Sequence, residues 1–358
     1  MIVFRADGNA SVGLGHVMRC LSIANAFKQT GMQCLFITAN NELQRIITGC
    51  GHENLVLDSE YNKMDDELRL FKDEVEKRKV EAIFVDSYFV TDRYLRELHA
   101  FCENKQILLT YIDDVLAFHY SCDVLINYNI YADLSDYRNL YHNCCEPEFL
   151  LNTSYAPIRA EFQNLPDRAV DESADCVLIS TGGADSEHIG YEIAKSIARH
   201  KEWDDISFHF VVGVMNLDKD RICALAKEAE NIIIHCNVKK MSELMQSCDV
   251  AVTAAGSTMY ELCATQTPSI TYVLADNQIP GAAGFEQAGV LCSAGDIREF
   301  GASVLADRLL NDAMRLLGDF NRRKQIALKM KAVVDGQGAA RIVQRVVEIC
   351  ATKYKEEI

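Results

Sequence analysis

The chain has 358 residues, of which 49% are hydrophobic and 25% charged, a composition typical of a soluble globular protein. This length predicts about two domains, each large enough for its own core. The formal net charge of −16 argues against general binding of nucleic acid, because a polyanion would meet a repelling surface. We therefore expect an anionic ligand to be bound locally, by helix N-termini and a few arginines.

The 14 cysteines are scattered singly, apart from Cys144-Cys145, and most lie in apolar runs. No Cys-x-x-Cys occurs, so buried reduced thiols are predicted rather than a disulfide framework or a metal site. The chain begins directly with a predicted strand, without the pattern of a signal peptide, and no apolar run approaches about 18 residues. These features predict a cytoplasmic protein without a membrane span.

The first half alternates short β-rich runs with amphipathic helical windows, which is typical of βα units on a parallel sheet. The predicted strands are 1–5, 33–38, 54–57, 81–86, 107–112 and 122–127, the last being the final strand of this half. The predicted helices are 17–30, 41–48, 64–79 and 92–103. Residues 128–172 lack this rhythm and contain three prolines, which predicts an inter-domain crossover.

The second half repeats the same alternation. Its predicted strands are 176–180, 207–212, 232–235, 250–253 and 269–273, and its predicted helices include 219–230, 240–247 and a last helix to about residue 353. A loop over 274–278 leads to a glycine-rich segment, 281–289, and the chain is again helical from 297. The pattern predicts two Rossmann-like α/β domains, 1–155 and 156–358, with the C-terminal helix able to pack back on the first. Ligands are then expected in a central cleft, at the carboxyl ends of both sets of strands.

A glycine-rich loop containing Gly13 and Gly15 joins the first strand to the first helix and leaves His16 at the join. A strand, loop and helix in this order direct backbone N–H groups and the positive helix end at one point, which suits a phosphate. An imidazole at that point is well suited to act as a general base. The alternative is a tight turn followed by a helix cap, since the dinucleotide pattern G-x-G-x-x-G is not met: position 18 is Met.

A second motif, Gly256-Ser257-Thr258-x-x-Glu261, follows the predicted strand 250–253. Thr258 and Glu261 have the spacing of a capping box that needs no ligand. The small residues would equally let a diphosphate approach the helix, while Glu261 accepts hydrogen bonds from ribose hydroxyls. The placement in the second Rossmann-like half favours nucleotide binding, and Gly182-Gly183 forms an analogous turn after strand 176–180.

Two acidic patterns and the histidines complete the candidates. Asp113-Asp114 ends a predicted strand, and we expect one of the pair to orient His16 or a loop rather than to form a catalytic dyad. Asp218-Lys-Asp220 is interpreted as the first turn of a helix rather than a metal-binding D-x-D pattern. The histidines show no paired ligand spacing, so no metal site and no cofactor is expected.

In its motifs the chain resembles the UDP-sugar hydrolases of pseudaminic acid biosynthesis and the related spore coat polysaccharide proteins. The matching segments extend in order over nearly the whole chain: 5–7, 15–21, 85–88, 112–114, 155–159, 181–185, 256–263, 277–278 and 335–338. The resemblance implies a GT-B fold and hydrolysis of UDP-2,4-diacetamido-2,4,6-trideoxy-β-L-altropyranose to UDP and the free sugar. The loop 7–15 departs in detail from the family pattern, and 128–150 does not match it.

The resemblance also implies roles for particular residues. His16 corresponds to the catalytic base, and Tyr88 and Arg159 to residues near the sugar and phosphates. The remaining substrate contacts are expected from Asp7, Gly15, Arg19, Asp113, Asn277 and Gln278, and the nucleotide contacts from Gly182, Gly183, Gly256, Ser257, Thr258 and Glu261. The expected mechanism is inverting and independent of metal, with Asp7 or Asp113 fixing the imidazole tautomer.

Other activities are compatible with this architecture. They are a GT-B glycosyltransferase using a UDP-sugar donor, a UDP-sugar 2-epimerase and a non-catalytic nucleotide-sugar-binding protein. The expected partners are the UDP-sugar substrate and the UDP product, with no nucleic acid, and the expected state is a monomer or weak homo-oligomer.

Overall fold

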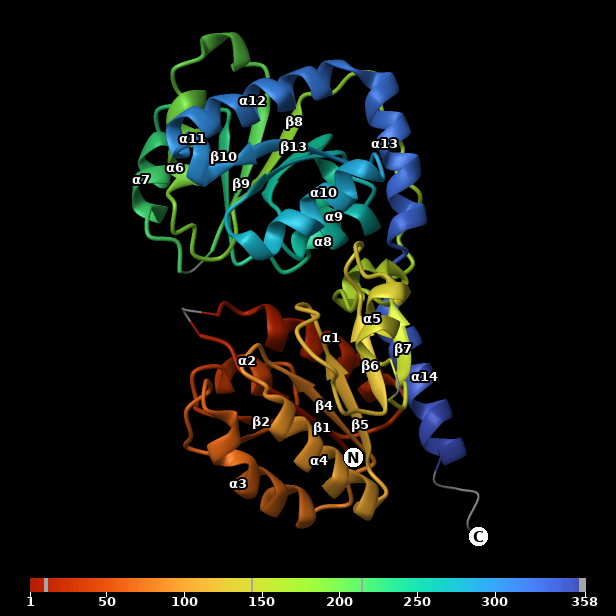
Figure 1. Cartoon of the computed structure of the whole chain (residues 1–358). Coiled ribbons are helices and arrows are strands. Elements are labelled where there is room, and N and C mark those ends of the chain that lie inside the picture. Colours follow the sequence, from red (N-terminus) through yellow and green to blue (C-terminus); the bar gives the residue numbers. More distant parts are fainter. Residues whose placement is uncertain (10–11, 143, 214, 354–358) are drawn as a thin grey trace. The chain divides into compact units, whose positions relative to one another are not determined.

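The computed structural model describes residues 1–9, 12–142, 144–213 and 215–353 (Figure 1). The chain divides into two compact units. Unit 1 comprises Met1–Ala160 and Gly336–Ile358, and unit 2 comprises Glu161–Asp335. The units thus divide at 160/161, five residues after the boundary placed by sequence, and the end of the chain is part of unit 1.

Unit 1 contains a seven-stranded parallel sheet of order β3-β2-β1-β4-β5-β6-β7. Its strands are β1 (Ile2–Ala6), β2 (Cys34–Thr38), β3 (Glu53–Val56), β4 (Ala82–Asp86), β5 (Leu108–Ile112), β6 (Val124–Asn127) and β7 (Glu148–Leu151). Its helices are α1 (Gly15–Gln29), α2 (Gln44–Gly49), α3 (Met64–Glu76), α4 (Asp92–Lys105), α5 (Leu134–Leu140) and α14 (Gly338–Lys353), with one 3₁₀ turn, η1 (Thr153–Tyr155).

Both faces of this sheet are covered, because successive side chains of each central strand alternate between two cores. On one face Val3 and Ile83 pack with residues of α3 and α4. On the other, Phe4 lies between Phe36 and Phe84, with ring centroids 5.0 and 4.9 Å away. This explains why β1, β2, β4 and β5 are mostly apolar and buried along their whole length.

The last helix, α14, packs against α1 (Figure 1). Its first residue, Gly338, lies so close to the chain that a Cβ there would be 2.2 Å from the carbonyl oxygen of Ala156. At the other end Lys353 forms an ion pair with Asp123. Close packing at Gly338 and charge at Lys353 therefore hold α14 on unit 1.

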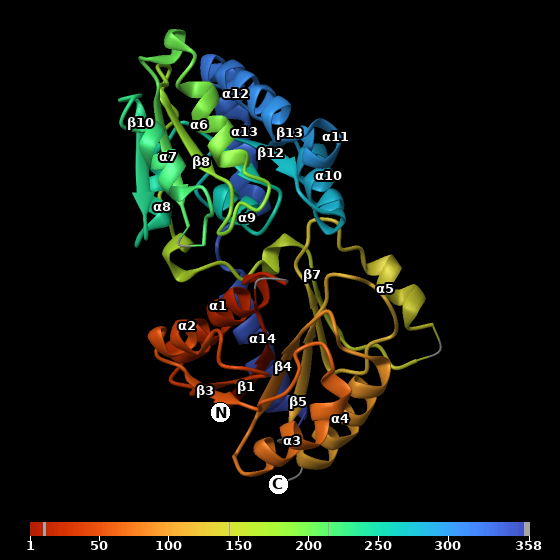
Figure 2. The ribbon, with the colours of Figure 1, turned by 90° about the vertical axis from the view of Figure 1, so that its left-hand side faces the viewer.

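Unit 2 contains a six-stranded parallel sheet of order β10-β9-β8-β11-β12-β13. Its strands are β8 (Cys176–Ser180), β9 (Ser207–Val212), β10 (Ile232–Cys236), β11 (Val250–Ala254), β12 (Ser269–Val273) and β13 (Leu291–Asp296). Its helices are α6 (Ile189–Ile197), α7 (Lys219–Leu225), α8 (Met241–Ser247), α9 (Thr258–Ala264), α10 (Ile279–Gln287), α11 (Ile297–Phe300), α12 (Ala302–Gly318) and α13 (Phe320–Val333), with three 3₁₀ turns, η2 (Ala160–Phe162), η3 (Lys201–Trp203) and η4 (Asp276–Gln278). Figure 2 shows α6 and α12 side by side against this sheet.

One prediction about elements is wrong, and two elements, α10 and β13, were not predicted. The segment 128–172, predicted to be an irregular crossover, contains α5 and β7, so β6 is not the last strand of its sheet. The glycine-rich segment 281–289 lies mostly in α10, and β13 follows it. Both missed strands lie at the edge of their sheet. β7 is short, and β13 contains Ser, Ala, Gly and Asp, which have a low or moderate propensity for strands. Pairing with the neighbouring strand, rather than intrinsic propensity, therefore makes them strands.

The order of strands reverses once in each sheet, between β1 and β4 and between β8 and β11. At such a switch point the loops after two neighbouring strands run in opposite directions and leave an open crevice at the carboxyl ends. His16 follows β1, and Gly256 follows β11. No helix in the described part of the chain has the length and apolar character needed to span a bilayer.

Candidate active site

His16 is the second residue of α1, directly after the glycine-rich loop that leaves β1. Within this loop Gly13 donates its N–H to the carbonyl of Asn9 over 2.8 Å and has φ +74°, a conformation that favours glycine. Positions 10 and 11 of the loop lie outside the described residues. The helix starts without a side-chain cap, since Leu14 occupies the N-cap position. His16 therefore does not serve as the cap of α1.

The ring of His16 is fixed by Asp86, the last residue of β4. Its Nδ1 lies 2.6 Å from Asp86 Oδ1. β1 and β4 are neighbours in the sheet, and Ala6 is paired with Asp86. The carboxyl ends of the two strands therefore lie side by side at the switch point. An ionised carboxylate can only accept a hydrogen bond, so Nδ1 carries the proton and Nε2 is the basic nitrogen.

Arg19, one helical turn beyond His16, keeps Asp86 ionised. Its Nε and Nη2 each donate to one oxygen of Asp86 over 2.6 Å. Its Nη1 donates to Asp114 Oδ2 over 2.7 Å and to the hydroxyl of Tyr128 over 3.0 Å. Burial by itself would raise the pKa of Asp86, but the charges of Arg19 and His16 and their hydrogen bonds outweigh it and hold that pKa well below its usual range.

Tyr88 packs edge-on against His16, with the ring centroids 4.4 Å apart. Its hydroxyl donates to Asp114 Oδ2 over 3.2 Å, and the residue is 43% exposed. The His16 side chain is 6% exposed and is surrounded by Asp86, Arg19 and Tyr88 rather than by an apolar core. The structure thus brings together three residues that the sequence predicted, namely His16, Arg19 and Tyr88.

Neither Asp7 nor Asp113 contacts His16, so the prediction that one of them fixes the imidazole tautomer is wrong. Asp7 accepts hydrogen bonds from Arg5 Nη1 over 2.5 Å and from the N–H of Ala39 over 2.8 Å. Asp113 is fully buried and accepts hydrogen bonds from the 113–116 turn and from two tyrosine hydroxyls, in a group formed by Val115, Leu116, Tyr120 and Tyr137. The interpretation of Asp113 as a loop-orienting residue agrees with these bonds.

Asp86 is the site residue that sequence reasoning missed. The available signal was its place at the end of a fully apolar strand, followed by Ser87 and Tyr88. The missing information was that β4 lies beside β1. Of the other residues expected in this unit, Gly15 is exposed at the start of α1, and Arg159 is half-buried in the segment after β7.

In unit 2 the predicted nucleotide-binding glycines follow β8 and β11. Gly182 has φ +96°, which itself favours glycine at that turn. A Cβ added at Gly183 or Gly256 would meet no atom within 4 Å, and neither residue has a positive φ. Packing around the Cβ positions of these two residues does not require glycine, while the Gly183 backbone lies against Gly213 and the Gly256 N–H donates to the carbonyl of Ala254 over 2.8 Å.

The capping box, given above as the alternative to nucleotide binding in the second motif, does not form. α9 begins at Thr258, and Ser257 occupies the N-cap position without a side-chain cap bond. Thr258 is therefore the first helical residue, and Glu261 is half-buried one turn on. At the end of β12, Asn277 is exposed, whereas Gln278 accepts a hydrogen bond from the N–H of Leu274 over 2.8 Å and closes its own loop.

Asp218 and Asp220 lie at the start of α7, as the helix interpretation predicted. Asp218 occupies the N-cap position, and its carboxylate is hydrogen-bonded to Nδ1 of His188 and forms an ion pair with Arg221. Both carboxylate oxygens of Asp218 thus contact neighbouring side chains, which agrees with a structural role in the first turn of α7.

No protein-family model matches the sequence. The chain is 26% identical over 262 residues to the UDP-2,4-diacetamido-2,4,6-trideoxy-beta-L-altropyranose hydrolase of Campylobacter jejuni, covering 73% of this chain and 86% of that protein. It is 22% identical over 354 residues to the spore coat polysaccharide biosynthesis protein SpsG of Bacillus subtilis, covering 99% of this chain and 98% of that protein.

Among solved structures, MurG of Acinetobacter baumannii is similar with a TM-score of 0.66 at 13% identity, over 97% of this chain and 99% of that chain. Structures similar to this chain include GT-B glycosyltransferases, and the two Rossmann-like parallel sheets agree with that class. The chain is therefore a homologue, at modest identity, of proteins named as UDP-diacetamido-trideoxy-altropyranose hydrolase and spore coat polysaccharide biosynthesis protein, and it has the GT-B fold.

Proposed function

We propose that this protein is a hydrolase that cleaves the C1–O bond of a UDP-linked 2,4-diacetamido-2,4,6-trideoxy hexose. The products are UDP and the free sugar, used in surface polysaccharide biosynthesis of the pseudaminic acid type. The observation that carries the proposal is the His16–Asp86 hydrogen bond at the switch point of the first sheet. The similarity to the Campylobacter hydrolase supports the choice of substrate.

In this proposal His16 is the general base. With Nδ1–H donated to Asp86, the free Nε2 takes a proton from a water molecule. The water oxygen bonds to C1 on the face opposite the diphosphate, the C1–O bond breaks, and its electron pair leaves with UDP. The reaction inverts the configuration at C1, and the resulting imidazolium is stabilised by the Asp86 carboxylate.

Binding of UDP is assigned to the loops after the strands of unit 2. Because Gly183 and Gly256 carry no side chain, phosphate oxygens have room at the turns after β8 and β11, and the Glu261 carboxylate is assigned to the ribose hydroxyls. Arg159 supplies a positive charge for the diphosphate. With its charge held in this way UDP is a good leaving group, and this step needs no strong general acid.

The test is an NMR time course with UDP-linked diacetamido-trideoxy hexoses, in which the anomeric proton of the released sugar reports turnover and stereochemistry. His16→Asn is expected to lower kcat by about 10²–10⁴-fold, because the amide cannot act as a base. UDP binding, measured by calorimetry, is expected to persist. His142→Asn is the matched control, since His142 is exposed.

Four outcomes contradict the proposal. Near-normal turnover of His16→Asn removes His16 from the mechanism. UDP release only in the presence of a hydroxyl acceptor identifies a glycosyltransferase. Incorporation of solvent deuterium at C2 identifies an epimerase. Thermal stabilisation by UDP-sugars that are never consumed identifies a binding protein.

A further inference from the structure

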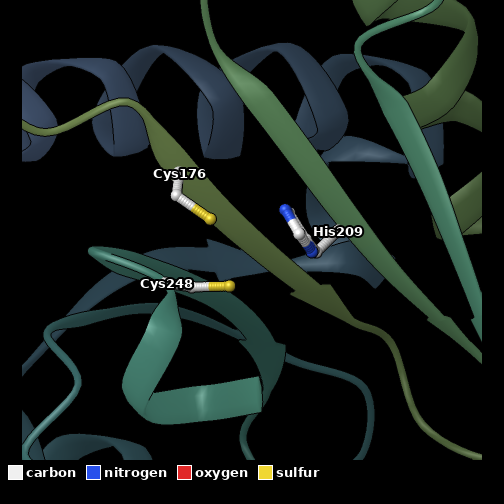
Figure 3. A group of neighbouring side chains, drawn as sticks. All are labelled: Cys176, His209 and Cys248. Atoms are coloured by element: carbon white, nitrogen blue, oxygen red, sulfur yellow. The ribbon is translucent and has the colours of Figure 1, made fainter.

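Three potential metal ligands converge in unit 2, outside the loops considered so far. They are Cys176, the first residue of β8, His209 in β9, and Cys248, which directly follows α8. One ligand atom from each lies within 4.8 Å of the other two. Figure 3 shows the two sulfur atoms and the imidazole ring pointing toward one another.

The fold brings these residues together from three neighbouring segments of the sheet. Cys176 is paired with Ser207, two residues before His209, so the side chains of Cys176 and His209 share one face. Asp249 donates its N–H to the carbonyl of Cys176 over 2.9 Å and accepts hydrogen bonds through its carboxylate from the N–H groups of Asp175 and Cys176. Backbone pairing thereby places Cys248 beside Cys176.

His209 is held in an orientation suited to a metal ligand. Its Nδ1 lies 2.9 Å from Nε2 of His235 on β10, and the two rings stack with centroids 5.0 Å apart. Because Nδ1 is engaged with His235, Nε2 is the ring nitrogen that can bind a metal ion together with the two cysteine sulfurs. Metal-bound histidines commonly have their second ring nitrogen fixed by such a hydrogen bond.

From this arrangement we propose that Cys176, His209 and Cys248 bind one Zn²⁺ ion. Two thiolates and an imidazole are the ligand types that Zn²⁺ prefers, and tetrahedral coordination separates bound sulfurs by roughly 3.8 Å, so only a small contraction of the cluster is needed. Cys176 and His209 are half-buried, which leaves access for the ion and for a water as fourth ligand. Two thiolates neutralise the ion, and Arg168, which donates to the carbonyl of Cys248, holds that ligand's backbone.

The role of the ion is structural. Cys176 and Cys248 lie where β8 and β11 begin, whereas the loops assigned to substrate follow the carboxyl ends of the strands. Binding joins β8, β9 and the start of β11, and it releases thiol protons. The inference does not depend on the proposed hydrolase activity.

The site is tested on the untagged full chain, kept reduced with a phosphine, by titration with Co²⁺ and then Zn²⁺. We expect one equivalent of Co²⁺ to give the visible bands of tetrahedral thiolate coordination, which Zn²⁺ displaces. Cys176→Ser and Cys248→Ser are each expected to weaken Zn²⁺ binding at least 100-fold. Cys223→Ser, a half-buried cysteine of the same unit outside the cluster, is expected to bind like the wild type.

A melting experiment gives an independent readout. Zn²⁺ is expected to raise the Tm of the wild type and of Cys223→Ser, but not of His209→Gln, which retains both thiols. Bands that persist in the Cys176→Ser/Cys248→Ser double variant overturn the proposal, because the metal then binds elsewhere. A Tm unaffected by Zn²⁺, or a Cys176–Cys248 disulfide found by mass spectrometry in a protein that takes up no metal, also overturns it.

Discussion

Asp86 accepts hydrogen bonds from three residues of α1, His16, Arg19 and Cys20. The contacts with His16 and Arg19 determine which ring nitrogen of His16 carries the proton. His16 Nδ1 lies 2.6 Å from Asp86 Oδ1 but 3.1 Å from Arg19 Nη2, which has no acceptor capacity. The shorter contact and the ionised state of Asp86 both place the proton on Nδ1. Arg19 therefore acts on His16 through Asp86, as a positioning residue.

Asp86→Asn is expected to lower kcat by about 10²–10⁴-fold while KM changes little. The amide can donate to Nδ1 and so favours the tautomer in which Nε2 is protonated and no longer basic. Turnover followed by NMR measures the loss of catalysis, and melting followed by circular dichroism measures any loss of stability, so the two effects are separated. Asp113→Asn is the comparison, since its contacts are all within the loop and its neighbours. The Asp113→Asn variant is expected to have a clearly lower Tm but little change in kcat. An unchanged kcat in folded Asp86→Asn would refute the assigned tautomer.

The element that completes unit 1 is α14, which comes from the other end of the chain. Its apolar side includes Ala339, Ile342, Val343 and Val346, all buried. Its attachment depends on Gly338, where the backbone of Tyr155 and Ala156 leaves no space for a side chain. A helix 16 residues long is thus positioned by a close backbone contact at its first turn.

Gly338→Ala is expected to reduce the free energy of unfolding of unit 1 by about 1–3 kcal/mol, because the methyl group overlaps a carbonyl that cannot move without shifting the chain. Urea denaturation followed by circular dichroism gives the value. Gly318→Ala is the matched control. Gly318 ends α12, and a Cβ there meets no atom within 4 Å, so the same substitution should be neutral or slightly stabilising. Equal unfolding midpoints for the two variants would contradict the packing argument.

At the scale of the whole molecule, the two units differ in how the chain builds them. Unit 2 is one continuous segment, 161–335, with its own six-stranded sheet. Unit 1 is discontinuous, because its seven-stranded sheet comes from 1–160 while α14 comes from the segment after residue 335. The complete core of unit 1 therefore draws on two separate segments of the chain, whereas that of unit 2 draws on one.

A fragment of residues 161–335 is expected to fold alone, with cooperative unfolding and dispersed amide resonances, since its core is complete. A fragment of residues 1–160 is expected to be less soluble, because the surface of α1 that contacts α14 is exposed. Supplying a peptide of residues 336–358 should raise its Tm. An unfolded 161–335 fragment, or a 1–160 fragment that is unaffected by the peptide, would contradict this division.

Most central strands and their following helices could be predicted, because their signals are local. An apolar run such as 82–85, bounded by Glu81 and Asp86, forms a buried strand in a parallel sheet. The edge strands β7 and β13 could not be predicted, since their sequences are weak and a neighbouring strand makes them strands. α10 was missed for a related reason: Gly281 and Gly284 lower its intrinsic helix propensity, and packing of Phe285 and Ala282 overrides it.

By itself the sequence determined the fold class and the join of strand, glycine-rich loop and helix that presents His16, because each depends on residues close together in the chain. Only the tertiary structure decided which carboxylate holds His16, since Asp86 reaches it through the pairing of β4 with β1 rather than through proximity in sequence. The same holds for Cys176, His209 and Cys248, whose spacing resembles no ligand motif and which strand order alone brings together. The physical reason is that a parallel sheet joins residues by strand order and register, and a single sequence does not state which strands become neighbours.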